Sequence, residues 1–471
     1  MPNFLGAGRP LDLRSARFAT VPARWLALAL VVTGTGAPAA AQAPEALRLN
    51  DRGYFHAPGL DVLAFHNWYS GMFSDSKLSG VELIHHGVRV ATNGDVRLGH
   101  TPEQWDPIPE FEGRDIVDGR VVARLAYPDH GFRYRVIVEA DGDAVVLGVE
   151  LDDPVPAPLE GRAGLNLELL PTAFFGRTFL ADGRPGAFPR HGAGAVAPAH
   201  GTLQPTALAT GGRLVLAPES PERRITVASR AGTLSLYDGR GQAQNGWLVV
   251  RQVLPSGRTG RVVEWRIEAH RIPDWVRPPM IAHSQAGYHP DQAKVAVIEL
   301  DRAYRGPTTA RLLRVEPDGS ETERFRGEVD PWGTWLRYRY AHFDFSAVTE
   351  PGVYRLAFGD RRTEPFVIAD NVYRDRVWQP TLDTFFPVQM CHMHVNDRYR
   401  VWHGAGHLDD ARQAPTDHVH FDLYAQGPTT DSPYEPGEHI PGLNVGGWHD
   451  AGDWDIRTQT QYATILTLVR A

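Results

Sequence analysis

Two carboxylates stand three residues apart near the carboxyl end of the sequence, in the stretch GGWHDAGDWD at residues 446–455. At a tight turn or the start of a helix, this spacing brings the side chains of Asp450 and Asp453 to one side of the backbone. Two neighbouring carboxylates can hold and polarise a water molecule, with one of them acting as general base. Taken alone the pattern is weak, because an aspartate-rich turn that caps a following helix has the same composition.

Aromatic side chains accompany this pair in the sequence. Tryptophan rings flank it on both sides, and their flat apolar faces suit the C–H faces of sugar rings. The preceding segment, residues 396–448, is rich in Gly, Pro, His and Asp and too irregular for a helix or a strand, as is typical of loops that line a cleft. We predict five substrate-binding residues: Trp448, His449, Trp454, Trp402 and His403.

Histidines and aspartates are interleaved in the same segment: His392, His394, His403, His407, His418 and His420 with Asp409, Asp410, Asp417 and Asp422. Cys391 with the first two histidines would be the start of a zinc site, and the aspartates offer oxygen ligands for calcium. A second cysteine is missing, however, and no spacing matches a closed zinc set. Polar loops that line a cleft are the simpler interpretation. We therefore assign no metal ligand and expect no cofactor, with a structural calcium or zinc ion as the open alternative.

The composition limits the class of protein. With 471 residues, 42% of them hydrophobic and 22% charged, the chain is typical of a soluble globular protein of two or three domains. Its formal net charge of −8, from 48 Lys and Arg against 56 Asp and Glu, leaves no basic excess to neutralise phosphates. We therefore expect no nucleic-acid partner. Cys391 is the only cysteine, which excludes a disulfide framework.

Residues 1–41 have the composition of an export signal. Four arginines precede the apolar run WLALALVV at residues 25–32, and Ala39-Ala40-Ala41 fits a signal peptidase site. The apolar run is too short to span a bilayer. We expect an exported protein, periplasmic or secreted, with no membrane span after removal of the signal.

Residues 45–271 read as a succession of short strands. FRYRVIVEA at 132–140 and AVVLGVELD at 144–152 are rich in Val, Tyr and Leu, and a DGD turn signal separates them. Because no helical period of useful length occurs here, the pattern predicts a large antiparallel β-sandwich of unknown role.

A proline-rich linker at 271–280 leads to a second series of strands, which includes the stretch WLRYRYAHFDF at 335–345. Their number and close spacing predict an immunoglobulin-like sandwich over residues 280–369. From residue 370 the apolar period becomes helical, with a helix expected to start at Pro380. A final helix is expected from an apolar stripe: Tyr462, Ile465, Leu466 and Val469.

Four separated motifs in this order resemble glycoside hydrolase family 9, in the cellulase-like members that carry an N-terminal immunoglobulin-like domain. They are HSQAGYHPDQAKVAVIE (283–299), SAVTEPGVYRLAFGDRRTEPFVIADNVYRD (346–375), the FF pair (385–386) and GGWHDAGD (446–453). The resemblance implies an (α/α)6 barrel that hydrolyses β-linked glucans with inversion. It also implies that Asp453 is the general base and that Asp450 helps to position the nucleophilic water. The sequence departs from the family at His449, where tyrosine is common.

Twelve barrel helices with short connections need at least about 190 residues, whereas 97 residues run from Asp375 to Ala471. We therefore expect residues 370–471 to be the first part of a truncated barrel. The resemblance places the general acid on a glutamate near the far end of the barrel, which this chain would lack, so the fragment alone is expected to be inactive.

Two other hypotheses remain open. The first is a non-catalytic exported protein that binds β-linked polysaccharides or oligosaccharides. The second is a secreted metal-dependent hydrolase that uses the histidines and aspartates of the loop segment.

Overall fold

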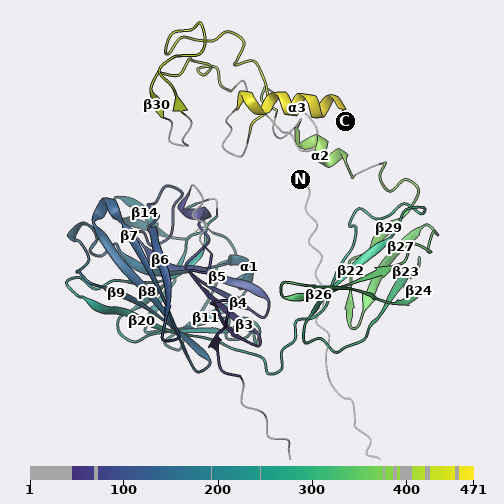
Figure 1. Ribbon diagram of the computed structural model, residues 1–471, viewed down its shortest axis with the longest axis horizontal. Coiled ribbons are helices and arrows are strands. Elements are labelled where there is room, and N and C mark those ends of the chain that lie inside the picture. The colour runs from purple at the N-terminus through teal and green to yellow at the C-terminus, as the bar shows by residue number, and fades with distance from the viewer. Residues whose placement is uncertain are drawn as a thin grey trace, which may run out of the picture. The chain divides into compact units, whose positions relative to one another are not determined.

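The computed structural model describes residues 45–67, 73–192, 194–243, 245–374, 377–385, 390–392, 406–419, 425–450 and 456–470. The predicted signal, residues 1–41, lies outside these ranges. Strands dominate the described chain as far as Ile368, and its longest helix, α3, follows near the C-terminus (Figure 1).

Residues 48–269 form two nine-stranded antiparallel sheets. The first has the spatial order β1 (Arg48–Leu49), β2 (Phe55–Ala57), β3 (Leu60–Ala64), β4 (Val81–His85), β5 (Val88–Arg97), β10 (Gly164–Leu169), β19 (Leu248–Val253), β18 (Leu234–Asp238) and β15 (Ala209–Gly211). The second has the order β12 (Arg184–Ala187), β11 (Thr178–Ala181), β16 (Arg213–Leu216), β17 (Ile225–Ser229), β20 (Gly260–Ala269), β9 (Ala144–Leu151), β8 (Phe132–Asp141), β7 (Arg120–Tyr127) and β6 (Glu110–Val117).

Shorter elements complete this part of the chain. They are the 3₁₀ turns η1 (Ser74–Ser76), η2 (Pro128–His130) and η3 (Ala157–Leu159), the helix α1 (Pro171–Phe174), and a two-stranded sheet of β13 (Val196–Ala199) and β14 (Thr202–Pro205).

The two sheets share one hydrophobic core. In β20 the side chains of Val263, Trp265 and Ile267 are buried, while those of Arg266 and Glu268 between and beyond them are exposed. This is the alternation of a strand with one face on a core. The Trp265 indole N–H donates a hydrogen bond of 2.8 Å to the side chain of Gln252, so its polar atom is satisfied inside the core. The expected β-sandwich is therefore present.

The central strands of the first sheet are buried on both faces. The leucines of β10 join the core, and Asn166 and Glu168 alternate with them, yet both are fully buried. Buried charges next to them are paired: Glu168 lies 3.0 Å from Arg97, and Lys77 lies 2.6 Å from Asp95. Pairing is required because an isolated charge away from water is costly. The outer face of this sheet is thus a closed polar layer rather than a solvated surface.

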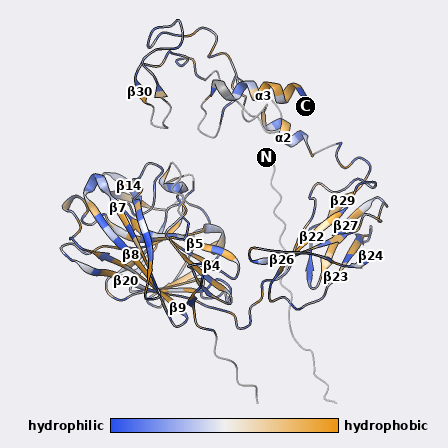
Figure 2. Cartoon of the chain, viewed as in Figure 1, coloured by the Kyte–Doolittle hydropathy of each residue, from blue (hydrophilic) through white to orange (hydrophobic). Residues whose placement is uncertain are grey.

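Residues 280–368 form a second, smaller sandwich. One sheet has the order β21 (Met280–Ala282), β22 (Val295–Asp301), β26 (Tyr338–Asp344) and β25 (Asp330–Trp335). The other has the order β24 (Glu321–Glu328), β23 (Thr309–Val315), β27 (Gly352–Phe358) and β28 (Arg361–Arg362), with β29 (Phe366–Ile368) also paired to β27. A separate core lies between these sheets and includes Phe343, Phe345, Tyr354 and Phe366. Figure 2 shows the apolar residues that run along the strands of both sandwiches.

The stretch 335–345, expected as one strand, is a hairpin. Trp335 ends β25 and pairs with Tyr338 at the start of β26, so Leu336 and Arg337 form a two-residue turn. Leu336 has a φ of +48°, a left-handed conformation of the kind that tight hairpin turns require. The sequence has no glycine or asparagine at the turn, so the usual signal is missing.

Beyond residue 370 the described residues form α2 (Gln379–Asp383), β30 (His418–Val419), β31 (Ala425–Gln426) and α3 (Thr458–Arg470). Pro380 lies in the first turn of α2, as expected from the sequence. The predicted final helix is α3, and its apolar stripe is exposed, with 73% of Tyr462 and 80% of Val469 accessible to solvent. Two helices do not make a barrel, so the (α/α)6 barrel stays a prediction.

Within the described ranges, every helix is too short or too polar to cross a membrane.

Candidate functional site

Asp450 is held by a cation just ahead of α3. Its carboxylate Oδ2 lies 3.2 Å from Nε of Arg457, and the two side chains are 25% and 31% exposed. Arg457 immediately precedes Thr458, the first residue of α3, so the helix start fixes where the guanidinium lies. The ion pair gives the carboxylate a defined orientation while solvent can still reach it. A water molecule can therefore bind to this group.

Trp448 is tied to two other segments. Its backbone N–H donates to Oε1 of Gln461 at 2.9 Å, and Nε2 of Gln461 donates back to the Trp448 carbonyl at 3.0 Å. Its indole N–H donates to the carbonyl of Phe385 at 2.7 Å. These bonds join the GGWHD turn to α3 and to the end of the segment that contains α2. The predicted contact of Trp448 with substrate remains a prediction.

A glycine shapes the same turn. Gly447 has a φ of +121°, a conformation that residues with a Cβ rarely adopt. Its carbonyl accepts a hydrogen bond of 2.8 Å from the backbone N–H of Cys391. The backbone of Met390 also pairs with that of Trp448. The backbone around Gly447 thus contacts a segment that lies more than fifty residues away in the sequence.

This pairing creates a cluster of three metal-binding side chains. Ligand atoms of Cys391, His407 and His449 all lie within 4.8 Å of one another. The cysteine is 3% exposed and His449 is 7% exposed, and the rings of His407 and His449 are 5.9 Å apart. In the part of the chain that the structure describes, no other such group of ligands occurs.

The donors of this cluster fit zinc rather than calcium. Thiolate and imidazole ligands suit Zn²⁺, whereas Ca²⁺ takes oxygen ligands. Nδ1 of His407 is hydrogen-bonded to the carboxylate of Asp410, and such a carboxylate partner is common behind metal-bound histidines. Three protein ligands would leave one position of a tetrahedral zinc for water or a further ligand.

The cluster differs from the zinc set considered from the sequence, which combined Cys391 with His392 and His394. Nε2 of His392 is hydrogen-bonded to the carbonyl of Gly406 at 3.0 Å. His392 is therefore not a member of the cluster. His394 lies outside the described residues, as does Asp422 of the calcium alternative. His449, expected at a substrate, is buried and faces the other two ligands.

Four of the predicted site residues lie outside the described ranges: Asp453, Trp454, Trp402 and His403. The structure therefore brings together Asp450, Trp448 and His449 of the predicted set, and it adds His407, Arg457 and Gln461. These contacts could not be predicted from the sequence, because the residues that make them lie far apart along the chain. The only local signal was the direct succession of a histidine and an aspartate in WHD.

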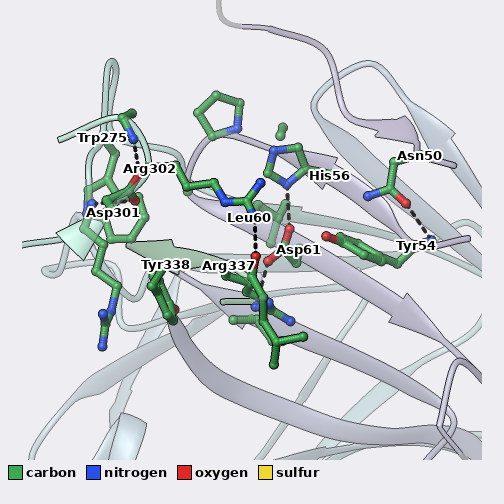
Figure 3. A pocket seen from close by; sticks show the side chains of 18 of the residues that line it. Asn50, Tyr54, His56, Leu60, Asp61, Trp275, Asp301, Arg302, Arg337 and Tyr338 are labelled. Carbon is green, nitrogen blue, oxygen red and sulfur yellow. Dashed lines mark hydrogen bonds and ion pairs between the residues drawn. The ribbon is translucent and has the colours of Figure 1, made fainter. Parts of the chain in front are cut away.

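A different cavity, of about 490 Å³, is lined by residues of β2 and β3, the 275–277 segment, residues 301–303 and the hairpin turn at 336–338. Figure 3 shows His56 and Arg337 both directed at Asp61, whose carboxylate lies 2.6 Å from Nδ1 of His56 and 3.0 Å from the Arg337 guanidinium. The hydrogen bond to Asp61 raises the pKa of His56. The predicted site residues do not line this cavity.

Comparisons with known proteins identify one part of the chain. Residues 277–363 match the model of the cellulase N-terminal Ig-like domain. This match confirms the predicted resemblance to cellulases at the immunoglobulin-like module. No curated protein matches the chain significantly.

Three solved structures of glycoside hydrolase family 9 match in part. A metagenome-derived endoglucanase is 27% identical with a TM-score of 0.28, over 37% of this chain and 30% of that chain. A family 9 protein from Bacteroides ovatus is 27% identical with a TM-score of 0.26, over 37% and 28%. A Zn-binding triple mutant of the endoglucanase J30 is 24% identical with a TM-score of 0.25, over 35% and 27%. The chain thus spans less than a third of each structure.

Proposed function

We propose that the protein is a glycoside hydrolase that cleaves β-glycosidic bonds in a β-glucan-type polysaccharide or oligosaccharide. The observation that carries this proposal is the succession of a cellulase-type Ig-like module at 277–363 and, after it, Asp450 held by Arg457 within the sequence motif GGWHDAGD. A module of this kind supports a glycosidase. The ordered carboxylate of Asp450, which stands three residues before a second aspartate in the sequence, suits the activation of water.

In the proposed inverting mechanism, Asp453 removes a proton from the attacking water and Asp450 positions that water. Inversion needs a protonated carboxyl group on the other side of the glycosidic bond, about 6.5–9.5 Å away, which leaves room for the water. We assign no such acid among the described residues. The Arg457–Asp450 ion pair, 3.2 Å long, would keep the positioning carboxylate still during attack.

The proposed zinc centre would serve this site structurally. Cys391, His407 and His449 would hold the ion, and His449 is the direct neighbour of Asp450. A bound zinc ion would link three segments that otherwise meet only through hydrogen bonds, and so fix the backbone that carries Asp450.

Replacement of the base tests the assignment. In the protein purified from its natural host, Asp453→Asn should lower kcat on a soluble β-glucan by about 10²–10⁴-fold, the usual contribution of a general base, with little change in KM. Nuclear magnetic resonance of the first products should reveal the α-anomer. Near-wild-type turnover by Asp453→Asn would mean that another residue is the base, and a β-anomer product would exclude inversion.

A second candidate function, glycan binding without catalysis, is favoured by exposed aromatic rings on the Ig-like module. Trp332 and Trp335 of β25 are each 61% exposed, and the Trp332 ring lies 6.1 Å from that of Tyr340. Rows of such rings suit the faces of sugars. We further propose that the protein acts outside the cytoplasm, as its amino-terminal sequence indicates. Binding of β-glucan by the native protein without any hydrolysis would select this alternative.

A further inference from the structure

A cavity of about 620 Å³ opens in the large sandwich, beside β18, β19 and the start of β20. Its lining contains three arginines, Arg251, Arg258 and Arg261, and no Asp or Glu. It also contains the hydroxyl-bearing side chains of Thr233, Ser235, Tyr237 and Thr259. A positively charged hollow with several hydroxyl groups is suited to an anionic ligand that also presents polar groups.

Arg251 is the central charge and has no carboxylate partner. It is 1% exposed, and it donates hydrogen bonds to Oδ1 of Asn166 at 2.6 Å and to the backbone carbonyls of Arg97, Arg162 and Gly164. No Asp or Glu among the described residues has a carboxylate oxygen within 4.0 Å of the Arg251 guanidinium. Burial lowers the pKa of Arg251 to about 10, so the side chain is still charged at neutral pH.

Polar atoms around Arg251 lack partners. Nε of Arg251, Nδ2 of Asn166 and Nδ1 of His100 are all buried and make no hydrogen bond. The His100 ring stacks at 5.2 Å on that of Tyr237, which lines the cavity. A buried donor without an acceptor is unfavourable, because it has lost its bonds to water. Arg251 lines the cavity, so its Nε is a donor that an acceptor on an incoming molecule would satisfy.

The other two arginines differ in their partners. Arg261 is paired with Glu150 at 2.9 Å, so its charge is largely neutralised. Arg258 is exposed on the loop between β19 and β20, and it makes no ion pair with any described residue. Among the described residues, therefore, two arginines of the cavity form no ion pair: the buried Arg251 and the exposed Arg258. Burial lowers the pKa of Arg251, and Asp106 opposes this shift only from beyond ion-pair distance.

The wall of the cavity is fixed before any ligand binds. Gln252 accepts hydrogen bonds from Trp265 at 2.8 Å and from Ser229 at 2.7 Å, and its amide donates to the Ala231 carbonyl at 2.7 Å. At Gly232, with a φ of +99°, a Cβ would come within 2.6 Å of the same amide. Such prior order reduces the entropy that binding must offset.

We propose that this cavity binds an acidic saccharide, a uronate whose carboxylate lies against Arg251 and Arg258 while its hydroxyl groups bond to Thr233, Ser235 and Tyr237. The carboxylate would supply the missing anion, and the sugar ring would use the neutral polar lining. The site is independent of the carboxylates of the proposed hydrolase, so either can be present without the other.

Isothermal titration calorimetry on the full chain tests the proposal with three probes: a β-linked oligosaccharide containing glucuronate, the matched neutral glucose oligosaccharide and sodium sulfate. We expect the acidic saccharide to bind about tenfold or more tightly than the neutral one, because charge-assisted hydrogen bonds are the stronger ones. Its affinity should fall as salt is added, since the Arg258 end of the site is exposed.

Two variants locate the site. Arg258→Ala should weaken binding of the acidic saccharide by about tenfold, and Arg251→Met should weaken it further. Arg213→Ala, at an exposed position of β16 away from the cavity, should bind as the wild type does. If the Arg251→Met variant fails to fold, the affinity of the Arg258→Ala variant still shows whether the saccharide binds in this cavity.

Three results would overturn the proposal. The first is no measurable binding of the acidic saccharide, and the second is unchanged affinity in Arg258→Ala. The third is equal binding of sulfate and the saccharide, which would mean that the cavity recognises any small oxyanion and makes no use of the sugar. Loss of hydrolysis in Asp453→Asn with intact uronate binding would separate this site from the proposed function.

Discussion

At the scale of single residues, His449 and Asp450 are neighbours in the sequence whose side chains have different surroundings. His449 is buried against Cys391 and His407, whereas the carboxylate of Asp450 stays partly exposed and paired with Arg457. Neighbouring residues in an extended segment point to opposite sides. One side chain can therefore belong to a metal centre while the next belongs to a hydrolytic site.

The zinc centre leads to a prediction at this scale. The wild-type protein should bind about one zinc ion per chain, and Cys391→Ala should abolish this binding because the thiolate ligand is lost. Asp410→Asn, which changes only the hydrogen bond behind His407, should weaken zinc affinity by about 10–100-fold. Native mass spectrometry measures the number of zinc ions per chain. Competition with a chromophoric chelator measures the zinc affinity of the wild type and of each variant.

His392→Ala is the matched control. His392 is next to Cys391 in sequence, but it is bonded to the Gly406 carbonyl and lies outside the cluster. It should keep wild-type zinc affinity. A wild-type protein that binds no zinc at micromolar concentration would contradict the assignment.

At the scale of elements, the first sheet of the large sandwich depends on charges buried on its outer face. Lys77, which follows η1, reaches Asp95 of β5, and both side chains are fully buried. Tyr134 of β8 also donates a hydrogen bond of 2.9 Å to the Asp95 carboxylate. Burial lowers the pKa of Lys77, although Asp95 opposes the shift. The pair connects the η1 segment to a central strand.

Lys77→Met should therefore destabilise the protein strongly. Removal of one partner of a buried pair leaves an uncompensated charge and typically costs about 3–5 kcal/mol. Arg124→Ala is the control, since Arg124 and Asp115 form a pair whose side chains are 43% and 53% exposed, and such surface pairs contribute less than about 1 kcal/mol. Urea unfolding measures both; equal effects of the two variants would mean that Lys77 is not effectively buried.

At the scale of the whole molecule, the described residues form two separate hydrophobic cores. One contains Trp265 and belongs to the large sandwich, and the other contains Phe343 and belongs to the Ig-like module. The large sandwich also buries His85, fully shielded from solvent, with Nε2 bonded to the His270 carbonyl at 2.6 Å. Burial lowers the pKa of His85 to about 3.

Acid should therefore destabilise the large sandwich. Below the ordinary pKa of histidine, about 6.5, the unfolded chain takes up a proton at His85 that the folded chain does not, until the pH approaches 3. Stability is thus lost as the pH falls through this window, by about 2 kcal/mol between pH 6.5 and 4.5. Calorimetry should resolve a transition that moves down with pH, and this movement should be smaller in His85→Gln.

The substitution Phe343→Ala tests whether the two cores unfold independently. This substitution should lower the free energy of unfolding of the Ig-like module by about 3–5 kcal/mol, and so lower the temperature of its unfolding transition. The pH-dependent transition of the large sandwich should stay in place. A single transition that both changes move equally would mean that the two sandwiches unfold as one unit.

Much of the fold follows from the sequence because strand and helix periods are local. The stretches 132–140 and 144–152 alternate as strands do and are β8 and β9, and the stripe from Tyr462 to Val469 lies on α3. The hairpin turn at Leu336 was missed because its left-handed backbone is imposed by strand pairing rather than by a glycine. The sequence likewise indicated the carboxylate of Asp450, since it stands in a contiguous motif.

Only the tertiary structure decided which distant residues meet. Cys391, His407 and His449 are brought together by the pairing of two backbone segments around Gly447, and no short spacing announces such a set. The polar residues of β5 and β10 alternate as if they faced water, yet they are buried. Arg251 of β19 is buried too, and it has no ion-pair partner among the described residues. Local sequence sets the period of each element, because backbone geometry repeats every few residues. What covers a face, or completes a site, depends on contacts between segments that the chain itself keeps far apart.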